Sequence, residues 1–132
     1  MSRLTILGVG VDLVDVKRLA AVRARRDIMR MVCAPEERLE KLTDLGAAKL
    51  WCGKEAVAKC LSTGLWQKGI DWSDIVIIEN QVNLRGNAAA YGARCIFSLD
   101  YTRNGSMLMA VAMRWAAASG DEIVILNREE LA

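Results

Sequence analysis

A mostly apolar segment near the N-terminus, residues 4–11 (LTILGVGV), places the strongest constraint on the fold. Its β-branched and aliphatic residues favour a buried strand. Asp12 follows at once, so a carboxylate stands where the strand should end. Asp15 can cap a helix that begins just after it, because Asp side chains accept hydrogen bonds from the first free N–H groups of a helix. The fold is therefore expected to begin with a buried strand and a capped helix.

The remaining elements are predicted from hydrophobic periodicity and turn residues. Residues 47–61 form the clearest helix, because Leu50, Trp51 and Val57 belong to one apolar stripe. Further helices are expected within 27–43, interrupted near Pro35, and over 85–94; strands are expected over 75–78, 95–100, 108–115 and 122–126. Strands mixed unevenly with helices favour an α+β fold with a largely antiparallel sheet, built as one domain over residues 1–132.

The composition excludes several classes of chemistry. The chain has 132 residues and no histidine, which rules out Ser-His-Asp and Cys-His catalysis and histidine-ligated zinc sites. Its four cysteines form no CxxC pair, and we expect a reducing, cytoplasmic setting. The apolar run 107–113 is far shorter than the roughly 20 residues that span a bilayer. We therefore expect no membrane partner.

Positive charge is concentrated in one segment. The net charge of +2 and the seven aromatic residues give no reason to expect nucleic acid. Within residues 17–30, however, the balance is +5, so the rest of the chain sums to −3. A solvated helix face could carry the same charges, but the imbalance favours a docking surface for an acidic partner. The basic residues are Lys17, Arg18, Arg23, Arg25, Arg26 and Arg30.

Asp12 and Glu55 are candidate ligands for a metal ion. Asp12 alone is better explained as a helix cap than as a ligand. Glu55 with Lys59 is likewise better explained as the ordinary i,i+4 helix pair, worth about 0.2–0.5 kcal/mol. If Asp12 and Glu55 met, they would suit Mg²⁺, which uses one or two carboxylates and leaves room for substrate phosphates. Lys59 could then neutralise such a phosphate. The spacing in sequence leaves open whether the two carboxylates meet.

Other familiar sites are missing or weak. The Gly8-Val9-Gly10 segment lacks the third glycine of a dinucleotide fingerprint, and no GxxxxGK[ST] loop occurs. Cys52 and Cys60 are better explained as core residues than as nucleophiles, because the chain has no imidazole to lower the pKa of a thiol and the neighbouring lysines are the only candidates for that role.

Three blocks of sequence together resemble the 4′-phosphopantetheinyl transferase superfamily, most closely its short holo-[acyl-carrier-protein] synthase type. They are residues 10–18 (GVDLVDVKR), 51–64 (WCGKEAVAKCLSTG) and 97–102 (FSLDYT). The family pattern runs GxDxxxxxR, FxxKEAxxKAxGTG and SxSHT in the same order. The resemblance implies the α+β fold of that family, and transfer of 4′-phosphopantetheine from coenzyme A to a serine of an apo acyl carrier protein. It also implies Mg²⁺ and release of adenosine 3′,5′-bisphosphate.

By motif position, the resemblance implies roles for individual residues. Asp12, Glu55 and Lys59 are expected to be catalytic, with Asp12 and Glu55 holding the metal and Lys59 beside the diphosphate. Arg18 and Arg25 are expected to dock the carrier protein, and the chain is expected to form a homotrimer with active sites between subunits. The further residues expected at coenzyme A are Ser62, Gly64, Ser98 and Thr102.

The sequence also departs from the family pattern. Tyr101 replaces the histidine of SxSHT, Asp100 replaces its second serine, and Leu50 stands where an arginine is common. The hairpin around residues 80–84 is shortened. Two alternatives therefore stay open: an inactive homologue that binds coenzyme A or a carrier protein, and a plain α+β domain whose basic helix binds an acidic ligand. The resemblance does not choose among fatty acid, polyketide and peptide carriers.

Overall fold

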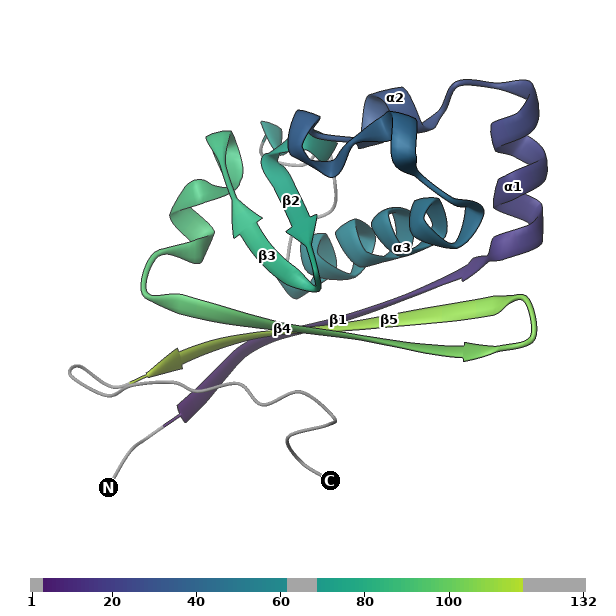
Figure 1. Ribbon diagram of the computed structural model, residues 1–132. Helices are drawn as coiled ribbons and strands as arrows, with labels where there is room; N and C mark the ends of the chain where they lie inside the picture. The colour runs from purple at the N-terminus through teal and green to yellow at the C-terminus, as the bar shows by residue number, and fades with distance from the viewer. Residues whose placement is uncertain (1–3, 62–68, 118–132) are drawn as a thin grey trace.

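The computed structural model describes residues 4–61 and 69–117 (Figure 1). Its base is a three-stranded antiparallel sheet in the order β1-β5-β4. The strands are β1 (Leu4–Asp15), β4 (Cys95–Asn104) and β5 (Met107–Ala117). The long helix α3 (Asp44–Cys60) lies across one face of this sheet. Alanine and small aliphatic side chains from both layers, including Ala56, Val57, Ala110 and Ala112, form the core between them.

The other elements lie on the same side of the sheet as α3 (Figure 1). A two-stranded hairpin, β2 (Ile75–Ile78) and β3 (Gln81–Leu84), borders one end of the helix. Helix α1 (Val16–Arg25) lies toward its other end, and the short helix α2 (Met29–Val32) lies above the middle of α3. Within residues 4–61 and 69–117, 3₁₀ helices complete the layer: η1 (Pro35–Glu37), η2 (Leu39–Lys41), η4 (Trp72–Asp74) and η5 (Gly86–Gly92).

Two glycines let β1 approach α3 closely. A Cβ atom added to Gly10 would lie 1.9 Å from the Ala56 carbonyl oxygen, and one added to Gly8 would lie 1.9 Å from the Cys60 carbonyl oxygen. No side chain fits at either position, so the strand backbone packs directly on the helix backbone. This contact brings the next inward-facing residue of β1, Asp12, to the C-terminal half of α3.

The opposite face of the sheet is apolar and exposed. Val9, Val11 and Leu13 are 44–59% exposed, and they pair in register with Met113, Val111 and Met109 of β5. The expected burial of residues 4–11 is therefore wrong for this face, because α3 covers only the other one. Together with Ile6, Leu7 and Met107, these three β1 residues form what we call the apolar sheet face.

Most predicted elements are confirmed, with informative differences. The Asp15 cap is present, since its Oδ1 accepts from the backbone N–H groups of Lys17 and Arg18 at 3.0 and 3.2 Å. The predicted helices within 27–43 and over 85–94 are wrong in extent or type, because the chain forms one short α-helix and 3₁₀ turns there. Strand β3 was not expected, and the strand expected at 122–126 lies outside the described residues. Within the described part of the chain, no helix has the length and apolar character needed to cross a membrane.

Candidate functional site

A lysine from α3 and a carboxylate from β1 meet where the strand and the helix pack closest. The Lys59 Nζ donates to Asp12 Oδ1 at 2.8 Å and to the Val11 carbonyl oxygen at 3.1 Å. The Asp12 side chain is largely buried, at 17% exposed, whereas that of Lys59 is 50% exposed. The site is therefore open to solvent from the lysine side.

Glu55 lies one turn before Lys59 on the same helix and acts electrostatically on both residues. Burial raises the pKa of the Glu55 carboxyl, the negative charge of Asp12 raises it further, and the Lys59 ammonium opposes them. The structure thus brings Asp12, Glu55 and Lys59 together, although 43 residues separate the two acids in sequence. We call Asp12 and Glu55 the carboxylate pair.

The carboxylate pair has the chemistry that a hard divalent cation requires. Two like charges close together repel each other, and a cation between them relieves that repulsion. Mg²⁺ prefers oxygen ligands and commonly takes one or two carboxylates together with substrate phosphates and waters. Among residues 4–61 and 69–117, no group of three Asp, Glu, Cys or His side chains could hold a metal. The residues present therefore fit Mg²⁺ shared with a phosphate ligand better than a metal enclosed by protein.

The buried thiols near this site are not nucleophiles. Burial, helped by the charge of Asp12, raises the pKa of Cys52 to about 12, and burial raises that of Cys60 to about 11. Because the thiolate is the reactive form, both side chains are inert near neutral pH. The prediction that they are core residues is confirmed.

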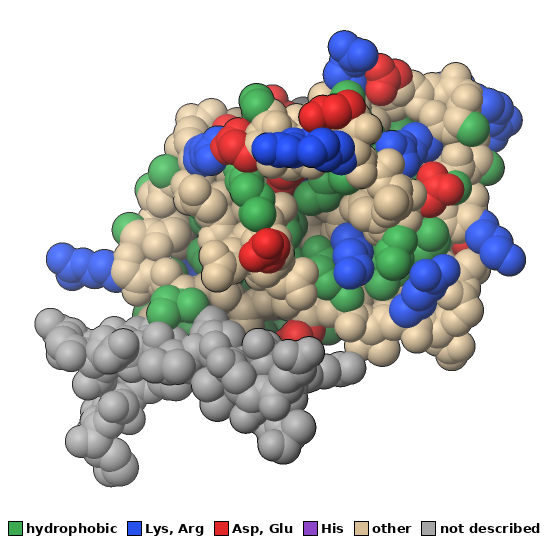
Figure 2. Space-filling model, in the orientation of Figure 1, with side chains coloured by type: hydrophobic (Ala, Val, Ile, Leu, Met, Phe, Trp, Pro, Cys, Tyr) green, Lys and Arg blue, Asp and Glu red, His purple; other side chains and the backbone are tan. Residues whose placement is uncertain are grey.

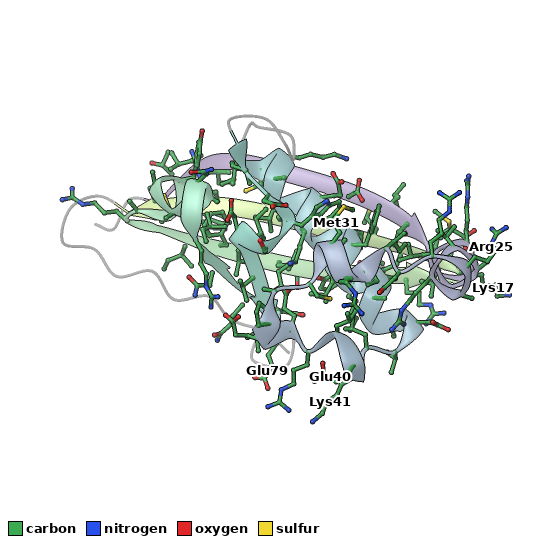
Figure 3. All side chains as sticks on the ribbon, turned by 90° about the horizontal axis from the view of Figure 1, so that it is seen from above. Lys17, Arg25, Met31, Glu40, Lys41 and Glu79 are labelled. Atoms are coloured by element: carbon green, nitrogen blue, oxygen red, sulfur yellow. The ribbon has the colours of Figure 1, made fainter. Side chains whose placement is uncertain are left out.

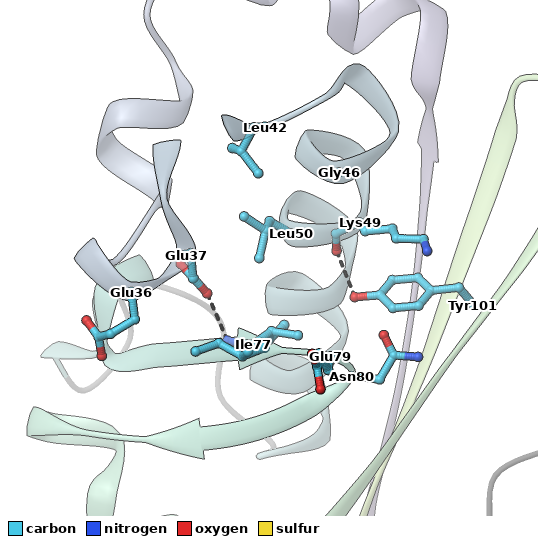
Figure 4. A pocket seen from close by; sticks show the side chains of 11 residues that line it. Glu36, Glu37, Leu42, Gly46, Lys49, Leu50, Ile77, Glu79, Asn80 and Tyr101 are labelled. Carbon is cyan, nitrogen blue, oxygen red and sulfur yellow. Dashed lines mark hydrogen bonds between the residues drawn. The ribbon is translucent and has the colours of Figure 1, made fainter. Parts of the chain in front are cut away.

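A cavity of about 260 Å³ opens on the flank of α3 that carries Gly46 and Leu50, away from Glu55 and Lys59 (Figure 4). We call it the Tyr101 cavity. It lies between α3, η1 and the turn of the β2–β3 hairpin. Its lining residues are Glu36, Glu37, Leu42, Gly46, Lys49, Leu50, Ile77, Ile78, Glu79, Asn80 and Tyr101.

Tyr101 is held firmly against α3. Its hydroxyl donates to the Lys49 carbonyl oxygen at 2.9 Å, and the Lys49 Nζ lies 5.5 Å from the centre of its ring. A methyl group on Gly53 would meet that hydroxyl at 2.3 Å, so only glycine leaves room for the tyrosine here. Tyr101 and Asp12 both pair with Ala110 of β5, which places their Cα atoms about 10 Å apart, two strand spacings, on one face of the sheet.

Not every predicted site residue joins this cluster. Ser98 and Thr102 pair with Met113 and Met109, which places both on the apolar sheet face, away from α3. The Ser98 hydroxyl accepts a hydrogen bond from Trp115 Nε1 at 3.1 Å. Ser62 and Gly64 lie outside the described residues.

The predicted docking arginines lie on α1, at the opposite end of the molecule from the β2–β3 hairpin (Figures 1 and 2). Arg18 and Arg25 are exposed, and Figure 3 shows Arg25 and Lys17 at the outer side of the helix. Arg23 pairs with Asp44 and Arg30 with Asp27. Within the described ranges, no salt bridge engages the four other basic residues of this segment: Lys17, Arg18, Arg25 and Arg26.

A buried ion pair that was not predicted joins Lys54 to Glu37, and Glu37 lines the Tyr101 cavity. The Lys54 Nζ donates to Glu37 Oε1 at 2.6 Å, to the Val32 carbonyl oxygen at 2.7 Å and to the Trp72 carbonyl oxygen at 3.0 Å. Glu37 also accepts from the backbone N–H of Ile77. Both charged side chains are at most 1% exposed. Lys54 lies three residues from both Trp51 and Val57, on the apolar stripe of the helix. This position was the one sequence signal that the lysine would be buried.

Comparison with known proteins gives one consistent family. The model of the 4′-phosphopantetheinyl transferase superfamily matches residues 8–112. A holo-[acyl-carrier-protein] synthase from Frankia casuarinae is 32% identical over 120 residues, which cover 83% of this chain and 98% of that protein. One from Hydrogenovibrio crunogenus is 37% identical over 79 residues, 54% of this chain and 61% of that protein.

The fold agrees with this result. The crystal structure of the Helicobacter pylori holo-[acyl-carrier-protein] synthase in complex with coenzyme A superposes with a TM-score of 0.68 at 20% identity, and covers 83% of this chain and 99% of that one. The predicted α+β fold of the family is therefore confirmed.

Proposed function

Because the chain belongs to the 4′-phosphopantetheinyl transferase superfamily and is of the holo-[acyl-carrier-protein] synthase type, we propose that it transfers 4′-phosphopantetheine from coenzyme A to a serine hydroxyl of an apo acyl carrier protein. Adenosine 3′,5′-bisphosphate is the leaving group, and Mg²⁺ is the cofactor. The observation that carries the proposal is the cluster of Asp12, Glu55 and Lys59 at the contact of β1 with α3.

The chemistry follows from the groups in this cluster. Asp12 and Glu55 hold the cation, which when bound neutralises charge on the diphosphate of coenzyme A. The Lys59 ammonium, half exposed beside Asp12, orients a diphosphate oxygen and stabilises the charge that develops on the leaving nucleotide. The serine oxygen forms a new bond to the phosphorus that carries pantetheine, and the bond from that phosphorus to the bridging oxygen breaks. The serine proton passes to a nearby base.

Carrier docking is assigned to α1. Arg18 and Arg25 are exposed and form no salt bridge with any residue that the structure describes, so this surface attracts an acidic protein. A depression of about 400 Å³ adjoins the helix and gives such a partner a place to bind; three arginines and one acid are among its lining residues, which are Arg23, Ala24, Arg25, Arg26, Asp27 and Leu39.

A homotrimer is proposed on the apolar sheet face. Six large apolar side chains there are 41–59% exposed, and a small chain gains by burying such a patch against copies of itself. Ser98 and Thr102 lie on this face, so they can approach coenzyme A only in the site of a neighbouring copy. Light scattering should give a trimer mass, and Val11→Asp should shift it toward the monomer. A monomer mass for the unaltered chain would refute the assignment.

We also propose a cytoplasmic location, which the four free cysteines support.

The activity is tested by mass spectrometry of apo carrier proteins incubated with the chain, coenzyme A and Mg²⁺. The expected result is the added mass of phosphopantetheine on one serine. Glu55→Gln should reduce transfer at least about a hundredfold while the melting temperature is unchanged, because it removes a charged metal ligand without a change of volume. Glu40→Gln, at an exposed acid of η2, is the matched control. Binding of coenzyme A without modification of any carrier would instead favour the inactive homologue.

A further inference from the structure

The Lys59 ammonium already occupies one of the two acids of the carboxylate pair. Its Nζ donates to Asp12 Oδ1 at 2.8 Å, and no other group in the described part of the chain donates a hydrogen bond to the Asp12 carboxylate. The i,i+4 pair of Lys59 with Glu55 that the sequence favours is not formed, since no salt bridge between described residues joins them. The lysine therefore neutralises the acid of the strand and not the acid of its own helix.

A second contact holds the ammonium at this place. Lys59 Nζ also donates to the Val11 carbonyl oxygen at 3.1 Å, on β1, which is an outer strand of its sheet. The Asp12 side chain is largely buried, whereas half of the Lys59 side chain is exposed. The lysine therefore lies between solvent and the buried acid, on the side from which a cation would enter.

The ammonium and a divalent cation compete for Asp12. A cation bound to either oxygen of this carboxylate would lie close to Lys59 Nζ and be repelled by it. The hydrogen bond that holds the ammonium is charged on both sides, which makes it stronger than one between neutral groups. A metal ion that arrives alone must displace Lys59 or bind beside a like charge, and its affinity is lowered in either case.

A diphosphate relieves this competition because its anionic oxygens attract the ammonium away from Asp12. An ammonium has three protons, and two of those of Lys59 are used by Asp12 and Val11. The third can bind a diphosphate oxygen before the bond to Asp12 breaks. The lysine side chain is flexible and half exposed here, so its rotation is enough to move the charge from the acid to the ligand.

We propose that Lys59 disfavours a divalent cation at Asp12 until coenzyme A is bound, so that metal and donor bind cooperatively. This inference rests on the proposed function and concerns the regulation of the same site. Coupling between two ligands is reciprocal, so coenzyme A and the metal raise the affinity for each other by the same factor. Part of that factor comes from the movement of Lys59, and this part is lost when the ammonium is removed.

Metal binding without turnover provides the test. Mn²⁺ prefers the same oxygen ligands as Mg²⁺, and the electron paramagnetic resonance signal of the free ion measures its binding to the full chain. A solution of Mn²⁺ and coenzyme A without protein is the blank. Lys59→Met should bind Mn²⁺ about tenfold more tightly than the unaltered chain in the absence of coenzyme A, which is about 1.4 kcal/mol. With saturating coenzyme A, this gain should shrink at least about fivefold.

The matched control is Lys49→Met, on the same helix, whose ammonium lies over the Tyr101 ring; it should change neither affinity. Adding Glu55→Gln to Lys59→Met should abolish the tighter binding, because the metal then lacks its helix ligand. An equal gain with and without coenzyme A would show that Lys59 acts only as a nearby charge, and it overturns the inference, as does the absence of any gain.

Modification of a carrier is measured separately, so that the two proposals can fail independently. If the unaltered chain modifies a carrier but Lys59→Met gains no affinity for Mn²⁺, the proposed function stands and the inference is wrong. If the gain is found and shrinks with coenzyme A but no carrier is modified, the inference stands and the proposed activity is wrong. Lys59→Gln, also uncharged, replaces the methionine variant should that variant fail to fold.

Discussion

Replacing Glu37 by glutamine should expose the energetic cost of the buried ion pair. In Glu37→Gln the Lys54 ammonium stays 0% exposed but loses the carboxylate that it touches at 2.6 Å. Two carbonyl oxygens remain as its acceptors, and neither carries a full charge. Breaking one partner of a buried pair costs about 3–5 kcal/mol. For a domain of this length, that loss corresponds to a fall in melting temperature of roughly 10–20 °C.

The pH dependence of this loss identifies its cause. Burial lowers the pKa of Lys54, and the hydrogen bond and charge of Glu37 oppose that effect. Without Glu37 the pKa falls further, so between the folded value and the unfolded value of about 10.4 the unfolded chain binds more protons. The stability of Glu37→Gln should therefore rise with pH from neutral toward pH 10, and its deficit against the unaltered chain should shrink.

Urea unfolding followed by tryptophan fluorescence measures both quantities. The protein concentration must be held fixed, because assembly stabilises the folded chain by mass action. Lys54→Met in the same chain removes the orphaned charge, so Glu37→Gln/Lys54→Met should be less destabilised than the sum of the single variants by about 1–3 kcal/mol. Additive effects, or a deficit in Glu37→Gln that does not change with pH, would refute the assignment of a buried charge pair.

Three other substitutions or treatments test separate parts of the structure. Gly10→Ala places a methyl group against the Ala56 carbonyl oxygen. It should lower the free energy of unfolding by more than about 3 kcal/mol in the same assay. A decrease below about 1 kcal/mol, the size expected of a surface substitution, would contradict the close packing of β1 on α3. Arg18→Glu should weaken carrier binding at least about tenfold at low salt and less at high salt, measured by calorimetry, whereas Arg30→Glu, already paired with Asp27, should change it less. Alkylation followed by mass spectrometry should leave Cys52 unmodified in the native chain near pH 7.5, because it is 0% exposed; rapid labelling would show that the core opens.

Local features of the fold were predictable because their signals are short-range. Asp15 caps α1 through its own side chain, and the 3.6-residue periodicity of α3 is visible in sequence. Strand β3 was missed because it has only four residues, too few for its polar and apolar alternation, itself typical of a half-buried strand, to stand out. The positive φ angles of Glu79 and Asn80 are those of a two-residue hairpin turn, for which Asn80 was the only sequence signal.

Long-range features needed the structure. The segment at 4–11 gave the impression of burial on both sides because Gly8 and Gly10, on the helix side, count as apolar. Motif spacing could indicate that Asp12 and Glu55 belong to one site, but only the register of β1, β5 and β4 shows that Tyr101 shares the face of Asp12 while Ser98 and Thr102 do not. The partner of Lys54 depends on the path of η1, which no local pattern specifies.

The alternation along β1 places the proposed catalytic acid and the proposed assembly face on opposite sides of one strand. Even-numbered residues from Gly8 to Asp12 face the helix, and odd-numbered residues from Val9 to Leu13 face the opposite side of the sheet. One residue inserted after Gly10 would turn Asp12, the proposed metal ligand, to the outer face and place an aliphatic side chain against the helix, whereas two would restore the alternation. Length changes in this strand among homologues should therefore come in even numbers. The one tolerant place is the irregularity between Ile6 and Gly8, where a surplus residue is already absorbed.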